Sequence, residues 1–332
     1  MRAFRHSVRW LWACLLLATG ALGWAKRRLQ RRPAVVVMAL HRVLDERDYC
    51  LTNSLSGILL RRNTFQALAA YVSRRFDVVD ASGTMPGPDS NRPRIAFTFD
   101  DGWHDNYDPA FRIARTCGIP MTIFVCPGLV GRNSPFWPEQ VVASIRAARP
   151  EVREEEVESV IEELKLSTPE NRERAIAALP LLSGRAPGSD DPDRTLTWAE
   201  IAEMDKCGVT FGVHTQTHQI LTIVPDNLAR PEILDSKAHI ERALNKPCRL
   251  FAYPNGNHSN ATRRLLSDAG FSRAFTTDRG AWTTASDPLA IPRMNVSETD
   301  VVSPAGRFSA AMFEYTVFWK AARASLANGG RA

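Results

Sequence analysis

Short hydrophobic runs alternate with stretches of helical periodicity through most of the chain. The runs have the length and composition of buried strands and cover residues 35–40, 94–99, 121–125, 209–213, 249–253 and 273–277. Between them, a helical pattern is found at residues 63–75, 106–117, 198–206, 232–244 and 260–269. A strand followed by a helix, repeated along the chain, predicts an α/β fold with a mostly parallel sheet. We expect this sheet to be closed, or nearly closed, into a barrel.

One stretch departs from this alternation. Residues 138–182 are helical in pattern throughout, with apolar residues at i, i+3, i+4 and i+7 from Val157. Seven glutamates between residues 151 and 163 lie off this apolar stripe and are explained most simply as a solvated helix face. We therefore expect residues 134–195 to form a helical insertion over one end of the barrel in residues 33–306.

The positive charge of the chain is concentrated at its N-terminus. The formal net charge is +6, but residues 1–32 hold eight lysines and arginines and no acidic residue. Residues 33–332 hold 34 basic and 36 acidic residues, so the body of the protein is not basic. An extended basic face for a nucleic-acid backbone is therefore not expected, and we predict no nucleic-acid partner.

The basic N-terminus flanks a hydrophobic segment. Sixteen uncharged residues lie between Arg9 and Lys26, close to the lower limit for a membrane-spanning helix. Three interpretations stay open: a membrane anchor, a cleaved signal peptide and a buried helix of the domain. Ala21-Leu22-Gly23 is a passable candidate for a signal cleavage site, whereas the basic residues after the segment oppose its translocation. We expect residues 1–32 to associate the protein with a membrane, with an extracytoplasmic body favoured over a cytoplasmic one. Residues 307–332 are expected to form a helix and tail.

Polar side chains directly follow several of the expected strands. His41, Asp100 and His214 each come after a hydrophobic run, with Asp101 and His218 close behind. The carboxyl ends of parallel barrel strands meet on one face, so we expect these side chains to lie together. Adjacent carboxylates resist joint ionisation unless a cation lies beside them, and one carboxylate with two imidazoles is a metal ligand set with open positions. The alternatives are that the aspartates cap a helix and that the histidines are structural.

Two of these motifs together resemble a known family. T-F-D-D-G at residues 98–102 and H-T-Q-T-H at residues 214–218 resemble the polysaccharide deacetylase family, also called the NodB-homology domain or carbohydrate esterase family four. The resemblance spans roughly residues 35–295. It implies a distorted (β/α) barrel of about seven strands and one divalent metal ion, usually Zn²⁺, with Co²⁺, Ni²⁺ or Mn²⁺ as alternatives. It also implies hydrolysis of N-acetyl groups on amino sugars of a polysaccharide or lipid-linked glycan.

The resemblance implies a role for each matching residue. Asp100 corresponds to the general base, and Asp101, His214 and His218 correspond to the metal ligands. The family's last motif normally supplies a general-acid histidine, which this chain lacks after residue 258. A permuted branch of the family places that histidine on the first strand, where His41 stands. The alternative for His41 is a structural role, as a hydrogen-bonded histidine at the end of a strand.

Four further residues are implied less directly. The family's third motif reads F-A-Y-P-N-G here, with Asn255 where tyrosine is usual. Because the family uses the backbone N–H at that place to stabilise the oxyanion, Asn255 and Tyr253 are expected in the oxyanion and substrate-binding region. Arg293 resembles a P-R motif of the same branch and is expected to orient Asp100, with an ordinary ion pair as the alternative. Trp137, at the edge of the insertion, either stacks on a sugar or roots the insertion in the core.

Two classes of function stay open. The first is a metal-dependent N-deacetylase, and the second is a non-catalytic carbohydrate-binding barrel. The complete set of base and metal ligands favours the enzyme, because a binding module needs no base. An O-acetyl esterase or another amidase with the same metal site is the nearest alternative among enzymes. The six cysteines show no paired spacing, so neither a cysteine zinc site nor a disulfide framework is predicted.

Overall fold

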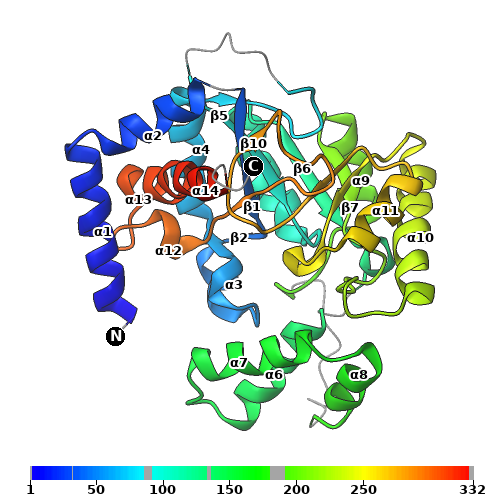
Figure 1. Cartoon of the computed structure of the whole chain (residues 1–332). Helices are drawn as coiled ribbons and strands as arrows, with labels where there is room; N and C mark the ends of the chain where they lie inside the picture. The colour runs from blue at the N-terminus through cyan, green and yellow to red at the C-terminus, as the bar shows by residue number, and fades with distance from the viewer. Residues whose placement is uncertain (1, 32, 86–91, 133–135, 180–190, 329–332) are drawn as a thin grey trace.

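A curled, mostly parallel sheet forms the centre of the computed structural model, which describes residues 2–31, 33–85, 92–132, 136–179 and 191–328 (Figure 1). Its strands are ordered β10-β1-β5-β6-β7-β8-β9. Their bounds are Ala34–Leu40 (β1), Arg94–Phe99 (β5), Met121–Val125 (β6), Thr210–Val213 (β7), Leu250–Ala252 (β8), Arg273–Phe275 (β9) and Trp282–Thr283 (β10). All neighbours on this path are parallel except β10, which runs antiparallel to β1. The expected α/β fold with a parallel sheet is confirmed.

Four shorter strands complete the sheets. β4 (Asp77–Val78) pairs with β5, while β2 (Arg42–Leu44) and β3 (Leu59–Arg61) form a separate two-stranded sheet. β11 (Met294–Asn295) lies parallel to β1, and Ile291 just before it forms a bridge with Phe275 of β9. Residues 291–295 therefore link the last parallel strand to the first and nearly close the barrel.

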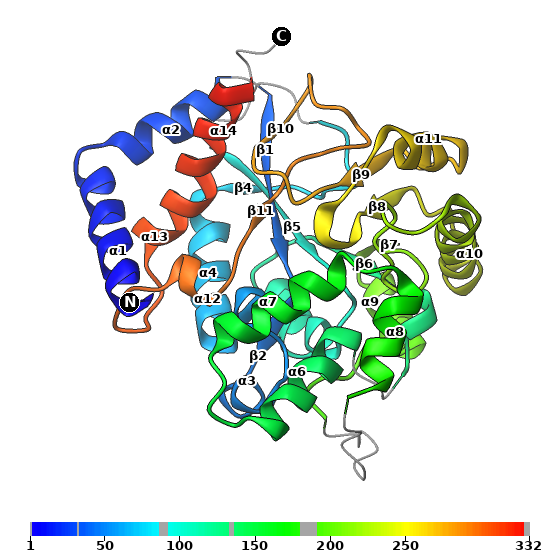
Figure 2. The same cartoon turned by 60° about the horizontal axis from the view of Figure 1, so that its bottom comes forward.

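Helices cover the outside of this sheet in three groups (Figures 1 and 2). One group follows the barrel strands: α4 (Arg62–Arg75), α5 (Arg112–Thr116), α9 (Trp198–Lys206), α10 (Asp226–Leu244) and α11 (Asn260–Asp268), with the short α3 (Glu46–Leu51) after β2. A second group crosses one end of the barrel: α6 (Trp137–Ala148), α7 (Glu154–Lys165) and α8 (Pro169–Ala177). The third group flanks β1: α1 (Arg2–Ala18), α2 (Ala21–Gln30), α12 (Glu298–Val301), α13 (Ala310–Glu314) and α14 (Lys320–Asn328).

Prolines explain two differences between the observed helices and the expected ones. The expected helix at 106–117 is broken at Asp108, which has φ −133° and ψ 110°, because the residue before a proline avoids the helical region. The expected continuous helix at 138–182 is three helices; Pro150 follows the first, and Pro169 begins the third. Residues 134–135 and 180–190 of the expected insertion lie outside the described residues.

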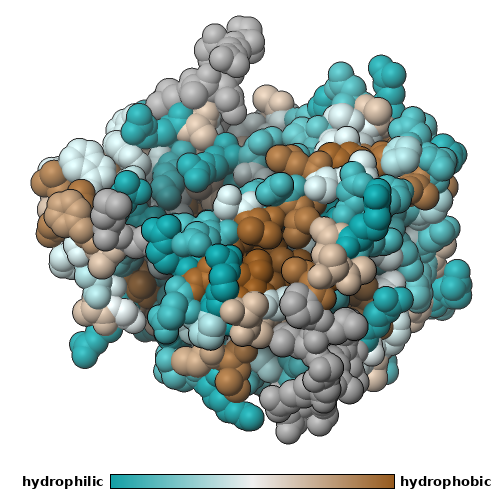
Figure 3. Space-filling model, turned by 90° about the horizontal axis from the view of Figure 1, so that it is seen from below, coloured by the Kyte–Doolittle hydropathy of each residue, from teal (hydrophilic) through white to brown (hydrophobic). Residues whose placement is uncertain are grey.

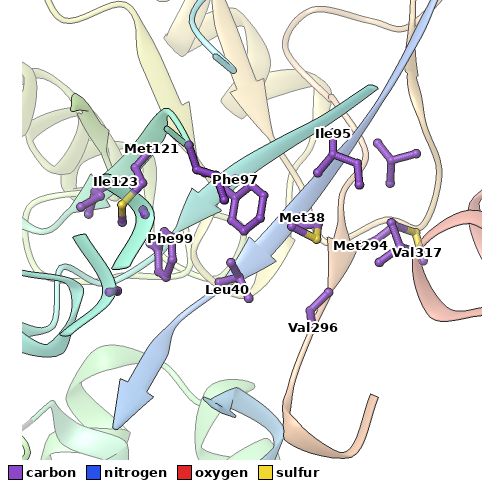
Figure 4. Packing of buried hydrophobic residues seen from close by; sticks show 14 of the residues in the cluster. Met38, Leu40, Ile95, Phe97, Phe99, Met121, Ile123, Met294, Val296 and Val317 are labelled. Atoms are coloured by element: carbon purple, nitrogen blue, oxygen red, sulfur yellow. The ribbon is translucent and has the colours of Figure 1, made fainter. Parts of the chain in front are cut away.

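Alternate residues of each barrel strand face two different layers. Val36, Met38 and Leu40 of β1 pack in the large outer layer, with the residues of Figure 4, against the helices. Val35 and Val37 pack in a smaller layer inside the barrel. All seven residues of β1 are buried, so the sequence shows a continuous apolar run rather than an alternating one. Side chains that continue the inner alternation past the end of a strand point into the mouth of the barrel.

The N-terminal helices pack on the domain in this structure. α1 and α2 lie against α13 and the segment that follows it, and Ala13, Leu22 and Ala25 are fully buried there (Figure 1). Within the described residues no helix by itself has the length and apolar content to cross a membrane, although α1 and α2 taken together do and are bent by 70° at their junction.

Candidate active site

Three of the predicted site residues meet because each continues the inner alternation of its strand. His41 follows β1, Asp100 follows β5 and His214 follows β7, all at the same end of the parallel sheet. The Nε2 atom of His41 lies 3.9 Å from Oδ2 of Asp100. Asp101 has a left-handed φ of 73°, and this turn directs its side chain back toward the mouth of the barrel beside His214. The structure thus brings the strand-end residues together as expected.

Asp101, His214 and His218 each direct one ligand atom toward a common point. Oδ1 of Asp101 lies 3.5 Å from Nε2 of His214 and 3.3 Å from Nε2 of His218. Oδ2 of Asp101 is occupied, because the indole N–H of Trp103 donates to it at 3.0 Å. Nδ1 of His214 lies 2.7 Å from the carbonyl oxygen of Ala252, which can only accept, so Nδ1 carries the proton and Nε2 keeps a lone pair.

This arrangement fits a single divalent metal ion. All three ligand atoms lie within 4.8 Å of one another. Tetrahedral zinc with bonds of about 2.0–2.1 Å has ligand atoms about 3.3 Å apart, close to the two Asp101–imidazole separations. Without a cation, protonated imidazoles of His214 and His218 would instead donate to Asp101. Burial alone would raise the pKa of Asp101, but such hydrogen bonding outweighs burial and holds the pKa well below its usual value. Asp101 is therefore a carboxylate, as a metal ligand must be.

Arg293 holds the second carboxylate of the site. Its Nη1 and Nη2 atoms donate to the two oxygens of Asp100 at 2.7 and 2.6 Å, and its Nε donates to the carbonyl of Thr276. Both side chains are buried. Burial favours the neutral acid, but the charge of Arg293 outweighs it and lowers the pKa of Asp100. The structure thus places Arg293 where it orients Asp100. The ion pair joins residues 291–295, which nearly close the barrel, to the end of β5.

The third motif forms a tight turn at the edge of the site. Asn255 has φ 57°, a left-handed conformation that asparagine tolerates better than most residues. Gly256 has φ 78°, and a Cβ there would lie 2.0 Å from Oγ1 of Thr277, so only glycine fits. The side-chain Oδ1 of Asn255 accepts from Nζ of Lys165 at 3.1 Å. A lysine of the insertion therefore reaches the site, which the sequence did not indicate.

Tyr253 does not face the site, which corrects the expectation that it binds substrate. Phe251 and Tyr253 lie on the outward side of β8 and its extension, in the large outer layer, whereas Leu250 and Ala252 face inward. The hydroxyl of Tyr253 donates to the carbonyl of Leu289 at 2.9 Å, and its backbone N–H donates to Phe275. The two-residue period of the strand decides this placement.

The site lies on the floor of a cleft of about 210 Å³. The insertion supplies much of its wall, through Phe136, Trp137 and Ile161. Leu55, Ile58 and Ile220 add further apolar surface. Seen from this side of the molecule, hydrophobic residues gather in the middle of the face (Figure 3). Trp137 begins α6 and lies under the guanidinium of Arg172 at 5.1 Å, so it both lines the cleft and packs within the insertion.

Sequence reasoning missed a second buried charge cluster beside the site. Arg42, the residue after His41, is fully buried and donates to Asp105 at 2.9 Å and to Asp193 at 2.6 Å. Its guanidinium lies 4.2 Å from the ring of Trp103, the same indole that holds Asp101. The signal available in the sequence was Arg42 itself, a charged residue two positions after the end of an expected strand.

Glu139 joins this second cluster to the cleft. Its Oε1 accepts from the hydroxyl of Ser54 at 2.9 Å, while its Oε2 is buried without a hydrogen-bond partner among the described residues. Burial, assisted by the negative charge of Asp193 and opposed by Arg42, raises the pKa of Glu139 to about 8. The carboxyl is therefore mostly protonated at neutral pH and lines the cleft as a neutral group.

Comparison with known proteins finds one matching family. A family model described as polysaccharide deacetylase matches residues 87–274. The Bacillus subtilis (strain 168) protein YxkH is 20% identical over 203 residues, which are 61% of this chain and 51% of that protein. The chain thus spans about half the length of this curated relative.

Solved structures share the fold. The Streptococcus pyogenes deacetylase PplD, in complex with acetate, is 17% identical with a TM-score of 0.55, over 86% of this chain and 98% of PplD. IcaB from Ammonifex degensii is 20% identical with a TM-score of 0.54, over 80% of this chain and 92% of IcaB. At these identities the likeness concerns the fold, and it supports the expected distorted barrel of about seven strands.

Proposed function

Because this chain belongs to the polysaccharide deacetylase family, we propose that its cleft hydrolyses N-acetyl groups on the amino sugars of a glycan. One observation carries the proposal: the free ligand atoms of Asp101, His214 and His218 converge next to Asp100, a buried carboxylate held by Arg293. A non-catalytic barrel has no use for such a base beside a cation site.

We propose that Asp101, His214 and His218 hold one divalent cation. Two imidazoles and one carboxylate suit Zn²⁺ among the common cations, with Co²⁺, Ni²⁺ and Mn²⁺ as alternatives. When bound, such an ion lowers the pKa of a coordinated water and polarises the acetyl carbonyl. The protein prepares this site by fixing the tautomer of His214 through Ala252 and by holding Asp101 through Trp103.

Asp100 is the proposed general base. Arg293 occupies one lone pair on each carboxylate oxygen, and each oxygen keeps a second one for a proton from the attacking water. The same ion pair keeps Asp100 ionised at neutral pH. Arg293 thus fixes the position and protonation state of Asp100 without contacting the reacting atoms.

His41 is the proposed proton donor to the departing amine. It follows β1, the strand that pairs with β5, and Asp100 follows β5. Its Nε2 lies 3.9 Å from Asp100, and it lines the same cleft. Burial lowers the pKa of His41, although Asp101 and Asp100 oppose this effect. The imidazole is therefore neutral in the resting protein near pH 7. The proton that it donates is the one that Asp100 takes from the attacking water and passes to His41 before the amine departs.

The walls of the cleft match a substrate with an acetyl group and sugar rings. Trp137 and Phe136 supply aromatic surface of the kind that packs on the apolar face of a sugar. Asn255 lies at the edge of the cleft in a turn whose backbone N–H is proposed to stabilise the oxyanion. Lys165 and Glu139 add polar groups to the walls.

Acetate release tests this proposal. The purified chain is incubated with oligomers of N-acetylglucosamine and, separately, with an O-acetylated xylan, and acetate is measured. We expect release from the N-acetylated oligomers, a loss of about 100-fold or more in Asp100→Asn, and no change in Asp235→Asn, an exposed aspartate on α10. Because only proton abstraction is removed, Asp100→Asn should keep its metal.

Two results would contradict the proposal. Release from the O-acetylated glycan alone would make the protein an esterase with the same site. Glycan binding with no acetate release, equal in the wild type and Asp100→Asn, would make it a carbohydrate-binding barrel.

A further inference from the structure

The outer face of α1 is hydrophobic. Phe4, Val8, Leu11, Trp12 and Leu15 are 75%, 49%, 59%, 48% and 50% exposed, and their spacing places them on one side of the helix. The opposite side, with Ala13 and Leu16, is buried. Hydrophobic atoms are visible at the left edge of Figure 3, where α1 forms the edge of the molecule in Figure 1. A helix of a soluble domain normally exposes its polar side instead.

The helix pair is attached to the domain by buried polar contacts as well as by packing. Nζ of Lys26 on α2 lies 2.7 Å from the buried carboxylate of Glu314, which also accepts from the hydroxyl of Tyr71 at 2.8 Å. On α1, Arg9 pairs with Asp300 at 3.3 Å. These contacts hold the exposed apolar face in a constant orientation relative to the barrel.

The surface next to this face is basic. The chain has no acidic residue before Asp45, and Arg5, Arg27, Arg28 and Arg31 are exposed. The last three line a cavity of about 310 Å³ together with Trp24, which is 44% exposed. Phosphate groups are the anions that a cluster of arginines binds best, and tryptophan favours the boundary between lipid headgroups and acyl chains.

From this arrangement we infer that α1 lies in the plane of an anionic phospholipid surface, with its apolar face among the acyl chains and the α2 arginines on the lipid phosphates. An exposed apolar helix face bordered by arginines and tryptophan is the pattern of an interfacial helix. The acidic partners Asp300 and Glu314 are already paired with Arg9 and Lys26, so they leave the α2 arginines to the lipid. This inference does not rest on the proposed deacetylase activity.

Vesicle flotation of the full chain tests the inference. Vesicles contain phosphatidylcholine alone or phosphatidylcholine with phosphatidylglycerol. We expect binding that is stronger with phosphatidylglycerol and that weakens as salt is raised. The double variant Leu11→Ser, Leu15→Ser should bind about 10-fold or more weakly, whereas Leu228→Ser, Leu234→Ser, which changes two exposed leucines of α10, should bind as the wild type does.

The arginines have a matched control. The triple variant Arg27→Gln, Arg28→Gln, Arg31→Gln should lose the preference for phosphatidylglycerol, while Arg149→Gln, Arg153→Gln, which removes exposed arginines near α7, should keep it. Circular dichroism of each variant checks that it is folded.

Three outcomes would overturn the inference. One is equal binding to both kinds of vesicle at all salt concentrations. A second is a wild-type dimer that the Leu11→Ser, Leu15→Ser variant dissociates, with no vesicle binding, because the face would then join two copies of the chain. The third concerns membranes from cells that express the chain: an interfacial helix is released by alkaline carbonate, and retention would show a spanning segment.

Discussion

Two buried charge clusters share the indole of Trp103 and differ in what each still lacks. Around Arg42, the cation is part of the protein, and Asp105 and Asp193 surround it at hydrogen-bond distance. Around Asp101, three ligand atoms face one another, and no lysine or arginine of the described residues pairs with them. The Arg42 cluster is complete, and it joins β2, the turn at Asp105 and the end of the insertion. The Asp101 cluster is incomplete, and this supports the cation proposed for it.

The difference separates stabilising charge from functional charge. Buried ions are tolerated when the fold itself provides the partner, and removing that partner leaves an uncompensated charge. Donors that converge without a partner reduce the stability of the empty protein and increase its affinity for a cation. Substitutions in the two clusters should therefore have opposite consequences for metal content and for unfolding.

The largest expected effect is in the incomplete cluster. His214→Ala leaves two ligands, which rarely suffice for a catalytic metal, so the protein should lose its bound divalent ion and about 1,000-fold or more of its acetate release. Elemental analysis and the acetate assay measure both. The half-buried His239 on α10, which stacks on Trp198 and is not one of the ligands, provides the control variant His239→Ala. Equal metal content in His214→Ala and the wild type would contradict the assigned ligand set.

In the complete cluster the effect should fall on stability. Arg42→Met leaves Asp105 and Asp193 without their cation, and we expect a loss of about 3–5 kcal/mol in the free energy of unfolding. Urea denaturation measures it. The metal content of the folded fraction should not change. Arg112→Met removes an arginine that is 61% exposed and should cost less than about 0.5 kcal/mol. An unfolding free energy equal to that of the wild type would show that the Arg42 cluster does not stabilise the fold.

His41 should affect the reaction and leave the metal in place. We expect His41→Ala to lower kcat by about 100-fold, because the departing amine loses its proton donor. Its neighbour Asp100 and the three ligands are unchanged, so metal content should equal that of the wild type. A variant with normal turnover would mean that the proton comes from another group, and the permuted arrangement would be wrong.

The effect that develops most gradually concerns the pH dependence of stability. The pKa of Glu139 is about 8 in the folded protein and near 4.3 when unfolded, so the folded state holds a proton that the unfolded state releases. This contribution is fully present below the unfolded pKa and is lost as the pH rises toward 8, by about 1 kcal/mol per pH unit. Glu139→Gln keeps the neutral shape but cannot ionise.

Comparing the wild type with Glu139→Gln isolates the contribution of the Glu139 carboxyl group. Unfolding free energies of the wild type and Glu139→Gln, measured from pH 5 to pH 8, should diverge with rising pH, the wild type losing more. Other titrating groups contribute equally to both curves. Parallel curves would mean that Glu139 is ionised in the folded protein and that the Arg42 cluster carries a negative charge where it lines the cleft.

Much of the fold and most of the polar residues of the candidate site were accessible from the sequence. The strands at 94–99 and 121–125 were predicted with the observed bounds, because buried parallel strands are short uninterrupted apolar runs. His41, Asp100 and His214 directly follow such runs at the inward phase of the strand, so local periodicity alone directs them to the same mouth. The same period, applied to β8, would have placed Tyr253 outside.

Other features depend on segments that are far apart in the chain. Arg293 meets Asp100 across 193 residues, and Arg42 meets Asp193 across 151, only because the barrel nearly closes and the insertion folds back. The apolar segment at the N-terminus is compatible with burial in lipid and with burial in protein, so its local composition left three interpretations open. The sequence by itself determined the parallel strands, the strand-end chemistry and the family. Tertiary structure decided which charges are paired, which side chains wall the cleft and which face of α1 stays exposed, because each of these depends on what packs against a residue rather than on its neighbours in the chain.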